Sequence, residues 1–452
     1  MRYPEVIKQR LFGTDGIRGK ANRELTPELA VRVGYCAVKV LAHDNARPYL
    51  LVGRDTRISG TMLESALAAG ICAAGGTAEL LGVVPTPAVA HLTRKKSADA
   101  GVVISASHNP AEDNGIKFFH YDGYKLPDEM EREIESLIRG GGEEKRPLGD
   151  KVGRACTSED AEEEYMKFLL STSRPDLSSM RVVVDCANGA VYRLAPMLLR
   201  NCGAEVIAIH SDPDGVNINR ECGSTHPEDL QRGVTEKGAD LGLAYDGDAD
   251  RVLAVDEKGR LVDGDFIMAI CALQMKRDKV LNDNALVTTV MTNLGFHQAM
   301  CREGVDVHLT QVGDRYVLES MLEKGLNLGG EQSGHIIFLD YATTGDGLIT
   351  SIKLLEAMQC SGEPLSSLAS VMKRIPQLLI NVSVKDKEAL GDSEIITRAL
   401  AEWERRLEGK GRILLRPSGT EPVVRVMVED VNEGRAETAA RELATLIERE
   451  MS

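Results

Sequence analysis

The segment Lys96-Ser-Ala-Asp-Ala-Gly-Val-Val-Ile-Ser-Ala-Ser-His-Asn-Pro110 predicts a turn, a buried strand and then a polar loop. The β-branched run 102–104 is typical of a buried strand, and the small polar residues after it mark where the strand opens onto the surface. The loop presents the hydroxyl of Ser107 beside an imidazole and an Asn-Pro turn. Because such a hydroxyl suits a covalent intermediate better than packing, Ser107 is our candidate nucleophile.

The first six residues of this segment recur twice in the chain. Lys237-Gly-Ala-Asp-Leu-Gly242 and Lys324-Gly-Leu-Asn-Leu-Gly329 follow the same pattern, and a polar cluster comes soon after each. A match of this length can arise by chance, because helix-to-strand turns of this kind are common. We favour three related α/β domains, each offering one loop at the equivalent end of its sheet. Since ligands of open α/β sheets lie at the carboxyl ends of strands, the three loops are expected to face a shared cleft.

Strand-like and helix-like runs alternate through most of the 452 residues, which indicates several α/β domains with largely parallel sheets. The strand candidates are 49–52, 102–104, 182–184 and 285–290. The helix candidates are 61–74, 126–139 and 157–170. A stretch rich in glycine at 140–147 is typical of a linker.

The C-terminal segment predicts a small α+β module. Its expected strands are 378–384, 412–415 and 423–428, and its expected helices are 388–407 and 435–450. Leu443, Leu446, Ile447 and Met451 recur at helical spacing, so one face of the last helix is expected to be core. We therefore predict four domains. Three are α/β domains: 1–155 carries the Ser107 loop, 156–258 an acidic loop and 259–372 a third polar loop. The fourth, 373–452, is an α+β domain.

The composition excludes several classes of partner. A formal net charge of −15 argues against a general nucleic-acid or anionic-membrane surface, although it leaves room for a local basic pocket. The chain has no apolar run of membrane-spanning length, and its first residues lack the apolar segment of a signal peptide. The nine cysteines form no C-x-x-C pair, which favours reduced thiols over zinc or disulfides. We expect a cytoplasmic protein with no nucleic-acid and no membrane partner.

The acidic loop Asp246-Gly-Asp-Ala-Asp-Arg251 follows a strand-like run and predicts a metal site. Three neighbouring carboxylates repel one another unless a cation holds them, and Mg²⁺ suits oxygen ligands and phosphate together. A solvated acidic turn is the alternative. A calcium EF-hand with Glu257 as its twelfth residue is excluded, because Arg251 stands where glycine is needed and 252–255 predicts a strand. We therefore expect one Mg²⁺ per chain.

The stretch Arg416-Pro-Ser-Gly-Thr-Glu-Pro422 joins two expected strands of the last domain. A guanidinium, two hydroxyls and a glycine-exposed backbone can cradle a phosphate without a P-loop, and Arg425 can add a second guanidinium. A simple hairpin turn is the alternative. The chain contains no G-x-x-x-x-G-K-[ST] motif, so nucleoside-triphosphate chemistry of that type has no support.

Other polar segments supply further candidates. Glu331-Gln-Ser-Gly-His335 carries donors and acceptors suited to sugar hydroxyls, although a surface turn explains it equally well. Arg18 stands in a glycine-rich stretch where it could steady a phosphate. Lys117 is a candidate general acid or base if nearby cations lower its pKa, and an ordinary surface lysine otherwise. Three further histidines show no ligand spacing, and we take them as structural: His43, His91 and His210.

These motifs together resemble the α-D-phosphohexomutase superfamily and, within it, the bacterial phosphoglucosamine mutases. The matching segments stand in the family's order across almost the whole chain, at 12–19, 105–110, 246–251, 330–335 and 416–422. Two further segments, 312–319 and 343–348, resemble the phosphoglucosamine branch in particular.

The resemblance implies three related α/β domains with mixed sheets, plus a smaller C-terminal α+β domain, around a central cleft. It implies that Ser107 is the phosphoserine and that Mg²⁺ is held by a phosphoserine oxygen with Asp246, Asp248 and Asp250. Lys117 matches the family's suspected proton-transfer lysine. A homodimer is also expected from the family.

The remaining site residues fall into three groups. Glu331 and Ser333 are implied to bind sugar hydroxyls, and we place Arg251 and His335 with them as substrate-binding residues. We count Arg18 and His108 among the catalytic residues, with His108 contacting phosphate rather than acting as a paired base. The non-transferred phosphate is implied to be bound by Arg416, Ser418, Gly419, Thr420 and Arg425.

The implied activity is a reversible conversion of glucosamine 6-phosphate to glucosamine 1-phosphate, feeding UDP-N-acetylglucosamine synthesis. It proceeds through phospho-Ser107 and a 1,6-bisphosphate intermediate, with a hexose 1,6-bisphosphate as activator. The nearest alternative is the same chemistry on mannose or glucose phosphates. A phosphatase with Asp246 as nucleophile and a non-catalytic metal- or sugar-binding protein are alternatives from other classes. A Ser-His hydrolase is disfavoured, because Ser107 and His108 are adjacent and no G-x-S-x-G surrounds them.

Overall fold

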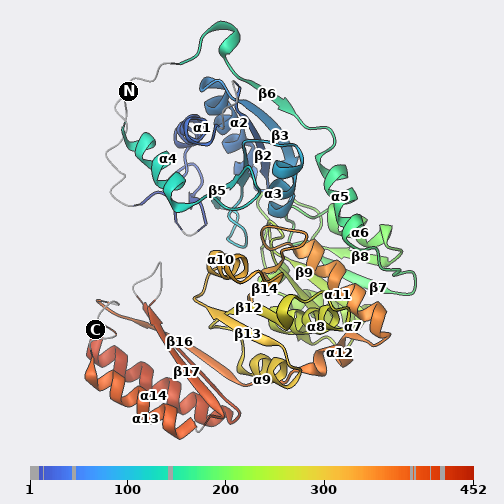
Figure 1. Cartoon of the computed structure of the whole chain (residues 1–452), viewed down its shortest axis with the longest axis vertical. Helices are drawn as coiled ribbons and strands as arrows, with labels where there is room; N and C mark the ends of the chain where they lie inside the picture. The colour runs from blue at the N-terminus through green and yellow to red at the C-terminus, as the bar shows by residue number, and fades with distance from the viewer. Residues whose placement is uncertain are drawn as a thin grey trace. The chain divides into compact units, whose positions relative to one another are not determined.

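The computed structural model describes residues 10–13, 15–42, 47–140, 146–386, 390, 393–407, 409–417 and 423–451. Two compact units make up the chain, and Figure 1 labels most of their helices and strands. The first unit consists of Met1–Val290 and Asp306–Ser370, and the second of Met291–Val305 and Val371–Ser452.

The first sheet of the first unit has six strands in the order β1-β5-β4-β2-β3-β6. These strands are β1 (Ile17–Lys20), β2 (Tyr49–Arg54), β3 (Thr77–Val83), β4 (Ala100–Ile104), β5 (Asp113–His120) and β6 (Arg154–Thr157). The helices between them are α1 (Pro27–Leu41), α2 (Ile58–Ala73), α3 (Thr86–Lys95) and α4 (Asp128–Gly140). Helix α1 begins at Pro27 because the side chain of Thr26 accepts a hydrogen bond from the amide of Leu29 and proline suits the first turn of a helix.

The second sheet has five strands in the order β11-β10-β9-β7-β8. They are β7 (Arg181–Asp185), β8 (Glu205–Ile209), β9 (Leu241–Tyr245), β10 (Val252–Asp256) and β11 (Leu261–Val262). The accompanying helices are α5 (Ala161–Thr172), α6 (Leu194–Asn201) and α7 (Glu228–Lys237).

The third sheet has four strands in the order β13-β12-β14-β15. They are β12 (Ala285–Thr289), β13 (Asp306–Thr310), β14 (Leu328–Gly330) and β15 (Ile336–Phe338). The helices of this part of the unit are α8 (Gly264–Arg277), α10 (Asp314–Lys324), α11 (Gly347–Ser361) and α12 (Leu365–Leu368).

The three sheets share one four-stranded plan, which confirms three related α/β domains with mixed sheets. In each plan three strands are parallel and the fourth is antiparallel, in the orders β3-β2-β4-β5, β8-β7-β9-β10 and β13-β12-β14-β15. The six-residue repeat lies at the same place in all three, between a helix and the third strand: α3 and β4, α7 and β9, α10 and β14.

The structure gives a physical reason for the repeat. Its second position takes a left-handed conformation that ends the helix, with φ of 52°, 57° and 67° at Ser97, Gly238 and Gly325. At its fourth position, a side-chain oxygen accepts a hydrogen bond from a backbone amide at or just before the neighbouring parallel strand. These pairs are Asp99 with Tyr49 (2.8 Å), Asp240 with Arg181 (2.7 Å) and Asn327 with Asn282 (3.1 Å).

The glycine that closes each repeat lets a helix pack directly on the strand. A Cβ would lie 2.2 Å from Thr93 Oγ1 at Gly101, 2.7 Å from a Leu230 methyl at Gly242 and 2.5 Å from Met321 Sδ at Gly329. The second, fourth and sixth positions of the repeat therefore end a helix, tie the turn to a neighbouring strand and let a helix pack closely on the third strand.

The predicted strands and helices of the first unit are found with small shifts of their ends. The largest shift is at the predicted helix 157–170, where α5 begins at Ala161 instead. Residues 154–157 form the exposed edge strand β6, which pairs with β3 from Thr77 to Leu80. The first sheet therefore continues beyond the glycine-rich stretch 140–147, of which 141–145 lie outside the described residues.

The second unit contains a three-stranded antiparallel sheet in the order β16-β18-β17. Its elements are β16 (Gln377–Ser383), β17 (Gly411–Pro417), β18 (Val423–Asp430), α9 (Leu294–Arg302), α13 (Glu394–Leu407) and α14 (Glu433–Met451). The predicted core face of the last helix is confirmed, since Leu443, Ile447 and Met451 are buried and Leu446 packs against the same cluster. Helix α9 belongs to this unit because Asn293, at its start, donates a 2.9 Å hydrogen bond to Glu429 of β18.

Two general properties follow from the described residues. None of their helices combines the length and the hydropathy that crossing a bilayer requires. All nine cysteines are free, and five of them are buried.

Candidate active site

The loop after β4 places Ser107 in a buried and conformationally strained position. Its side chain is 1% exposed and its φ is 52°, a left-handed value that is uncommon for serine. Ser107 Oγ donates a 2.6 Å hydrogen bond to Asp246 Oδ2 and lies 3.2 Å from His108 Nδ1. The first two of the three expected loops therefore meet at the candidate nucleophile.

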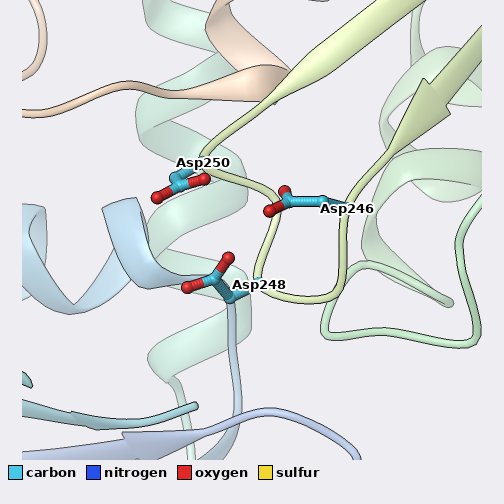
Figure 2. Close-up of side chains that lie close together, drawn as sticks. All are labelled: Asp246, Asp248 and Asp250. Carbon is cyan, nitrogen blue, oxygen red and sulfur yellow. The ribbon is translucent and has the colours of Figure 1, made fainter. Parts of the chain in front are cut away.

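The acidic loop between β9 and β10 gathers three buried carboxylates. Figure 2 shows Asp246, Asp248 and Asp250 together on one side of this short loop, and one oxygen of each lies within 4.8 Å of the others. Burial raises the pKa of Asp246 well above its usual value, and the charges of Asp250 and Asp248 raise it further. Burial and the charge of Asp248 likewise raise the pKa of Asp250.

The acidic loop fits a hard divalent cation. Asp248 Oδ1 and Asp250 Oδ1 are buried, and neither has a hydrogen-bond partner. A buried carboxylate oxygen without a partner is costly, and a cation coordinated by oxygens removes that cost together with the mutual repulsion. The other oxygen of Asp248 is already held by Thr86, whose hydroxyl donates to it at 2.7 Å.

Lys117 lies between two aspartates, not among cations. Its Nζ is 2.8 Å from Asp248 Oδ2 and 2.9 Å from Asp15 Oδ2, and the side chain is 3% exposed. Burial alone lowers the pKa of Lys117, but attraction to Asp15 and Asp248 outweighs it and holds the pKa above its usual range. We made the acid–base role of Lys117 conditional on a lowered pKa. The surroundings of Lys117 raise its pKa instead. Lys117 is a buried cation beside the acidic loop.

His108, beside the Ser107 hydroxyl, is close to the positive charges of Arg251 and Arg18. Arg251 Nη1 lies 3.1 Å from His108 Nδ1, and the amide of Arg251 donates to Asp246 Oδ1 at 3.2 Å. Burial, then Arg251 and Arg18, lower the pKa of His108 to about 4, so the imidazole is neutral near pH 7. Arg18 itself pairs with Asp15, the residue that also contacts Lys117.

The third loop, between β14 and β15, reaches the acidic loop through His335. Its Nε2 lies 4.0 Å from Asp250 Oδ2 and 3.5 Å from Asp314 Oδ2, and Asp314 also pairs with Lys125 of the first domain. Glu331 accepts a 3.2 Å hydrogen bond from the amide of Gly313. The side chain of Ser333 is exposed. Loops from all three related domains therefore come together, as the repeat predicted.

The predicted phosphate cradle lies in the second unit. Arg416 of β17 and Arg425 of β18 are directly opposite each other in the antiparallel register, and both are half-buried. Guanidiniums at opposed positions of neighbouring strands can bind one phosphate together. The other three residues predicted for this cradle, Ser418, Gly419 and Thr420, lie outside the described residues.

Sequence reasoning missed several residues that hold the site together. Arg57 and Asn219 bind the backbone of the Ser107 loop, and Thr86 binds Asp248. A charged segment at the end of β2, Arg54-Asp-Thr-Arg57, was the available signal for Arg57, since polar residues at strand ends line sites. For Asn219 and Thr86 the sequence carries no comparable signal.

Four family descriptions match consecutive parts of the chain. They are phosphoglucomutase/phosphomannomutase alpha/beta/alpha domain I at residues 9–145, domain II at 163–259, domain III at 263–375 and the C-terminal domain at 379–446.

Curated relatives and solved structures extend the likeness over almost the whole length. The phosphoglucosamine mutase of Clostridium tetani is 54% identical over 443 residues, which cover 97% of this chain and 99% of that protein. That of Desulforamulus reducens is 55% identical over 439 residues, with the same coverage. A phosphoglucomutase/phosphomannomutase family protein from Burkholderia thailandensis has a similar structure, with a TM-score of 0.80, 24% identity and 99% of each chain covered. Aspergillus fumigatus N-acetylphosphoglucosamine mutase, solved with GlcNAc-6P and magnesium, has a TM-score of 0.72, 19% identity and coverage of 100% of this chain and 97% of that one.

Proposed function

The chain belongs to the phosphoglucomutase/phosphomannomutase family, and we propose that it acts as a phosphoglucosamine mutase, an isomerase that interconverts glucosamine 6-phosphate and glucosamine 1-phosphate. The observation that carries the chemistry is the 2.6 Å contact between Ser107 Oγ and Asp246, in a group of three buried carboxylates. The choice of sugar rests on the curated relatives that are more than half identical over nearly the full length.

The proposed reaction moves a phosphoryl group twice. The 1-hydroxyl oxygen of glucosamine 6-phosphate attacks the phosphorus of phospho-Ser107; the bond from phosphorus to Ser107 Oγ breaks, and the proton of the hydroxyl ends on the serine oxygen. The product of this half-reaction is the 1,6-bisphosphate. After the bisphosphate turns over, Ser107 Oγ attacks the 6-phosphate, the bond from phosphorus to O6 breaks, and O6 takes the serine's proton. Glucosamine 1-phosphate leaves and the phosphoserine is restored.

Several residues of this chain suit the transferring phosphoryl group. Arg251, Lys117 and Arg18 supply positive charge around Ser107, and charge stabilisation is the main requirement of phosphoryl transfer. Asp246, Asp248 and Asp250 would hold Mg²⁺, which supplies further positive charge when bound. The neutral imidazole of His108 can accept or donate a hydrogen bond beside Ser107 without adding charge.

The other predicted roles belong to the same proposal. Glu331, Ser333 and His335 would bind the sugar, and the paired guanidiniums of Arg416 and Arg425 would hold the phosphate that is not being transferred. A hexose 1,6-bisphosphate would phosphorylate Ser107 in protein that lacks the modification. We expect the protein to be located in the cytoplasm. We also expect a homodimer, and light scattering of the purified protein would test this oligomeric state.

The sugar preference is tested by kcat/KM for three substrates under identical Mg²⁺ and activator concentrations. Glucosamine 6-phosphate should exceed glucose 6-phosphate and mannose 6-phosphate by at least about tenfold, which corresponds to roughly 1.4 kcal/mol of differential transition-state binding. Equal or reversed values would transfer the assignment to the glucose or mannose phosphates with the same chemistry.

A further inference from the structure

Arg57 is a fully buried cation whose guanidinium binds the Ser107 loop rather than the acidic loop. Its side chain is 0% exposed, and its Nε donates a 2.8 Å hydrogen bond to Asp55 Oδ2. Its Nη2 donates to the carbonyls of Ser107 (3.0 Å) and Asn109 (2.8 Å). Its Nη1 donates to the carbonyls of Pro110 and, at 3.0 Å, Asp113. One side chain therefore holds four backbone carbonyls of the loop.

Asn219 binds two of the same carbonyls from the second domain. Its Nδ2 lies 2.8 Å from the carbonyl oxygen of Ser107 and 3.0 Å from that of Asn109. The two carbonyls that flank His108 are thus each held by a guanidinium from the first domain and an amide from the second. The segment that carries Arg57 is itself tied to the second domain, because the amide of Ile58 donates to the carbonyl of Gly215 at 2.8 Å.

The backbone of Ser107 needs such restraint. A non-glycine residue with φ of 52° is strained and persists only where its surroundings fix it. Asp55 closes a ring that contributes to this: its Oδ2 accepts from Ser105 Oγ at 2.6 Å, and Ser105 Oγ accepts from the amide of Ser107 at 3.0 Å. With the amide and the carbonyl of Ser107 both fixed, the direction of its Cα–Cβ bond is fixed too, and from there its Oγ reaches Asp246.

We propose that Arg57 and Asn219 are positioning residues that together fix the backbone of the Ser107 loop and thereby aim Ser107 Oγ at the incoming phosphoryl group. The inference rests on the proposed function only in taking Ser107 as the phosphorylated residue. Neither side chain touches the acidic carboxylates in the contacts described, so both act through the backbone of the loop. Because Asn219 comes from the second domain, correct placement of the nucleophile depends on that domain.

The test uses Arg57→Lys and Asn219→Gly in the full-length protein. Lysine keeps the charge but cannot reproduce the planar arrangement of guanidinium donors. Glycine adopts the φ of 56° found at Asn219 without strain, so that change removes only the amide. The matched controls are Arg54→Lys and Asn22→Gly. Arg54 is the last residue of β2 and pairs with Glu64, and Asn22 has a φ of 62° in an exposed turn.

The first readout is the rate at which dephosphorylated protein takes up phosphate on Ser107 from glucose 1,6-bisphosphate, followed by intact mass and peptide mapping. Both variants should lose about 10- to 100-fold in this rate, the cost of a nucleophile misplaced by roughly 1 Å, while both controls keep the wild-type rate. If Arg57→Lys does not fold, Asn219→Gly alone carries the comparison. Wild-type rates in the variants would overturn the proposal.

The second readout separates positioning from general damage. With glucosamine 6-phosphate, kcat should fall in both variants while KM stays within about twofold of wild type, since neither residue belongs to the sugar or phosphate sites. A rise in KM that matches the loss of kcat would overturn the proposal. A wild-type protein that is phosphorylated on Ser107 but does not convert glucosamine 6-phosphate would refute only the proposed sugar.

Discussion

Gly247→Ala is the substitution whose effect can be worked out most directly from the structure. Gly247 stands between the carboxylates Asp246 and Asp248, and a Cβ there would lie 2.6 Å from the carbonyl oxygen of Ser107 and 2.8 Å from Asn219 Nδ2. Ordinary contact begins near 3.4 Å, so the carbonyl must retreat by about 0.8 Å. A displacement of that size stretches the 2.8 Å hydrogen bond from Asn219 and turns Ser107 away from the acidic loop.

The expected result is a loss of about 100-fold in kcat, because misplacing a reacting group by roughly 1 Å has that cost. Overpacking should also lower the free energy of unfolding by about 1–3 kcal/mol. The assay is conversion of glucosamine 6-phosphate at saturating Mg²⁺, with thermal unfolding measured in parallel. Gly140→Ala is the matched control, since a Cβ at Gly140 meets no atom within 4 Å, and it should leave kcat unchanged and not lower the free energy of unfolding. Wild-type kcat in Gly247→Ala would show that the Ser107 loop is not held tightly, and would refute the reasoning.

Three further predictions follow from the same structure. Chelation should abolish activity and Mg²⁺ should restore it, whereas Asp248→Asn should show no restoration at concentrations that saturate wild type; restored activity would contradict the metal assignment. Arg425→Ala should raise KM by about 10- to 100-fold, the value of a charge-assisted contact to phosphate; an unchanged KM would exclude the cradle. Burial raises the pKa of Asp346 to about 6, although hydrogen bonds lower it, so the folded protein retains a proton that the unfolded chain releases near 3.8. As pH rises from about 4 to about 7, the free energy of unfolding of the wild type should therefore fall by about 2–3 kcal/mol relative to that of Asp346→Asn. A difference between the two proteins that does not depend on pH in chemical denaturation would contradict this pKa shift.

The fold was predictable because its periodic features are local in sequence. The six-residue repeat combines a helix end, a strand tie and a packing glycine, and each of these works within its own helix-turn-strand unit. Three copies of it therefore predicted three related sheets. The edge strand β6 was missed because all four of its residues are exposed, so it carries no hydrophobic alternation.

The site was predictable where its chemistry is concentrated in one stretch. Ser107 and the three carboxylates from Asp246 to Asp250 each stand in a single loop, and the strands before them predicted where those loops lie. The charge state of Lys117 was not predictable, because it depends on Asp15 and on Asp248, which approach it from other segments.

The supporting contacts of the site were not predictable for the same reason. Arg57 lies 50 residues from Ser107 in sequence, and Asn219 lies 112 residues from it. The local sequence around Arg57 or Asn219 does not distinguish a residue that binds a loop backbone from a residue of an ordinary ion pair or turn. Only the folded arrangement of two domains brings both onto the same two carbonyls.

The central claim is that Ser107 carries the phosphoryl group, and peptide mapping of the purified protein tests it most directly. After incubation with glucose 1,6-bisphosphate and Mg²⁺, an acid-stable phosphate should be found on the peptide that contains Ser107, and Ser107→Ala should acquire none and lose mutase activity. Phosphate on Asp246, or full activity in Ser107→Ala, would contradict the account.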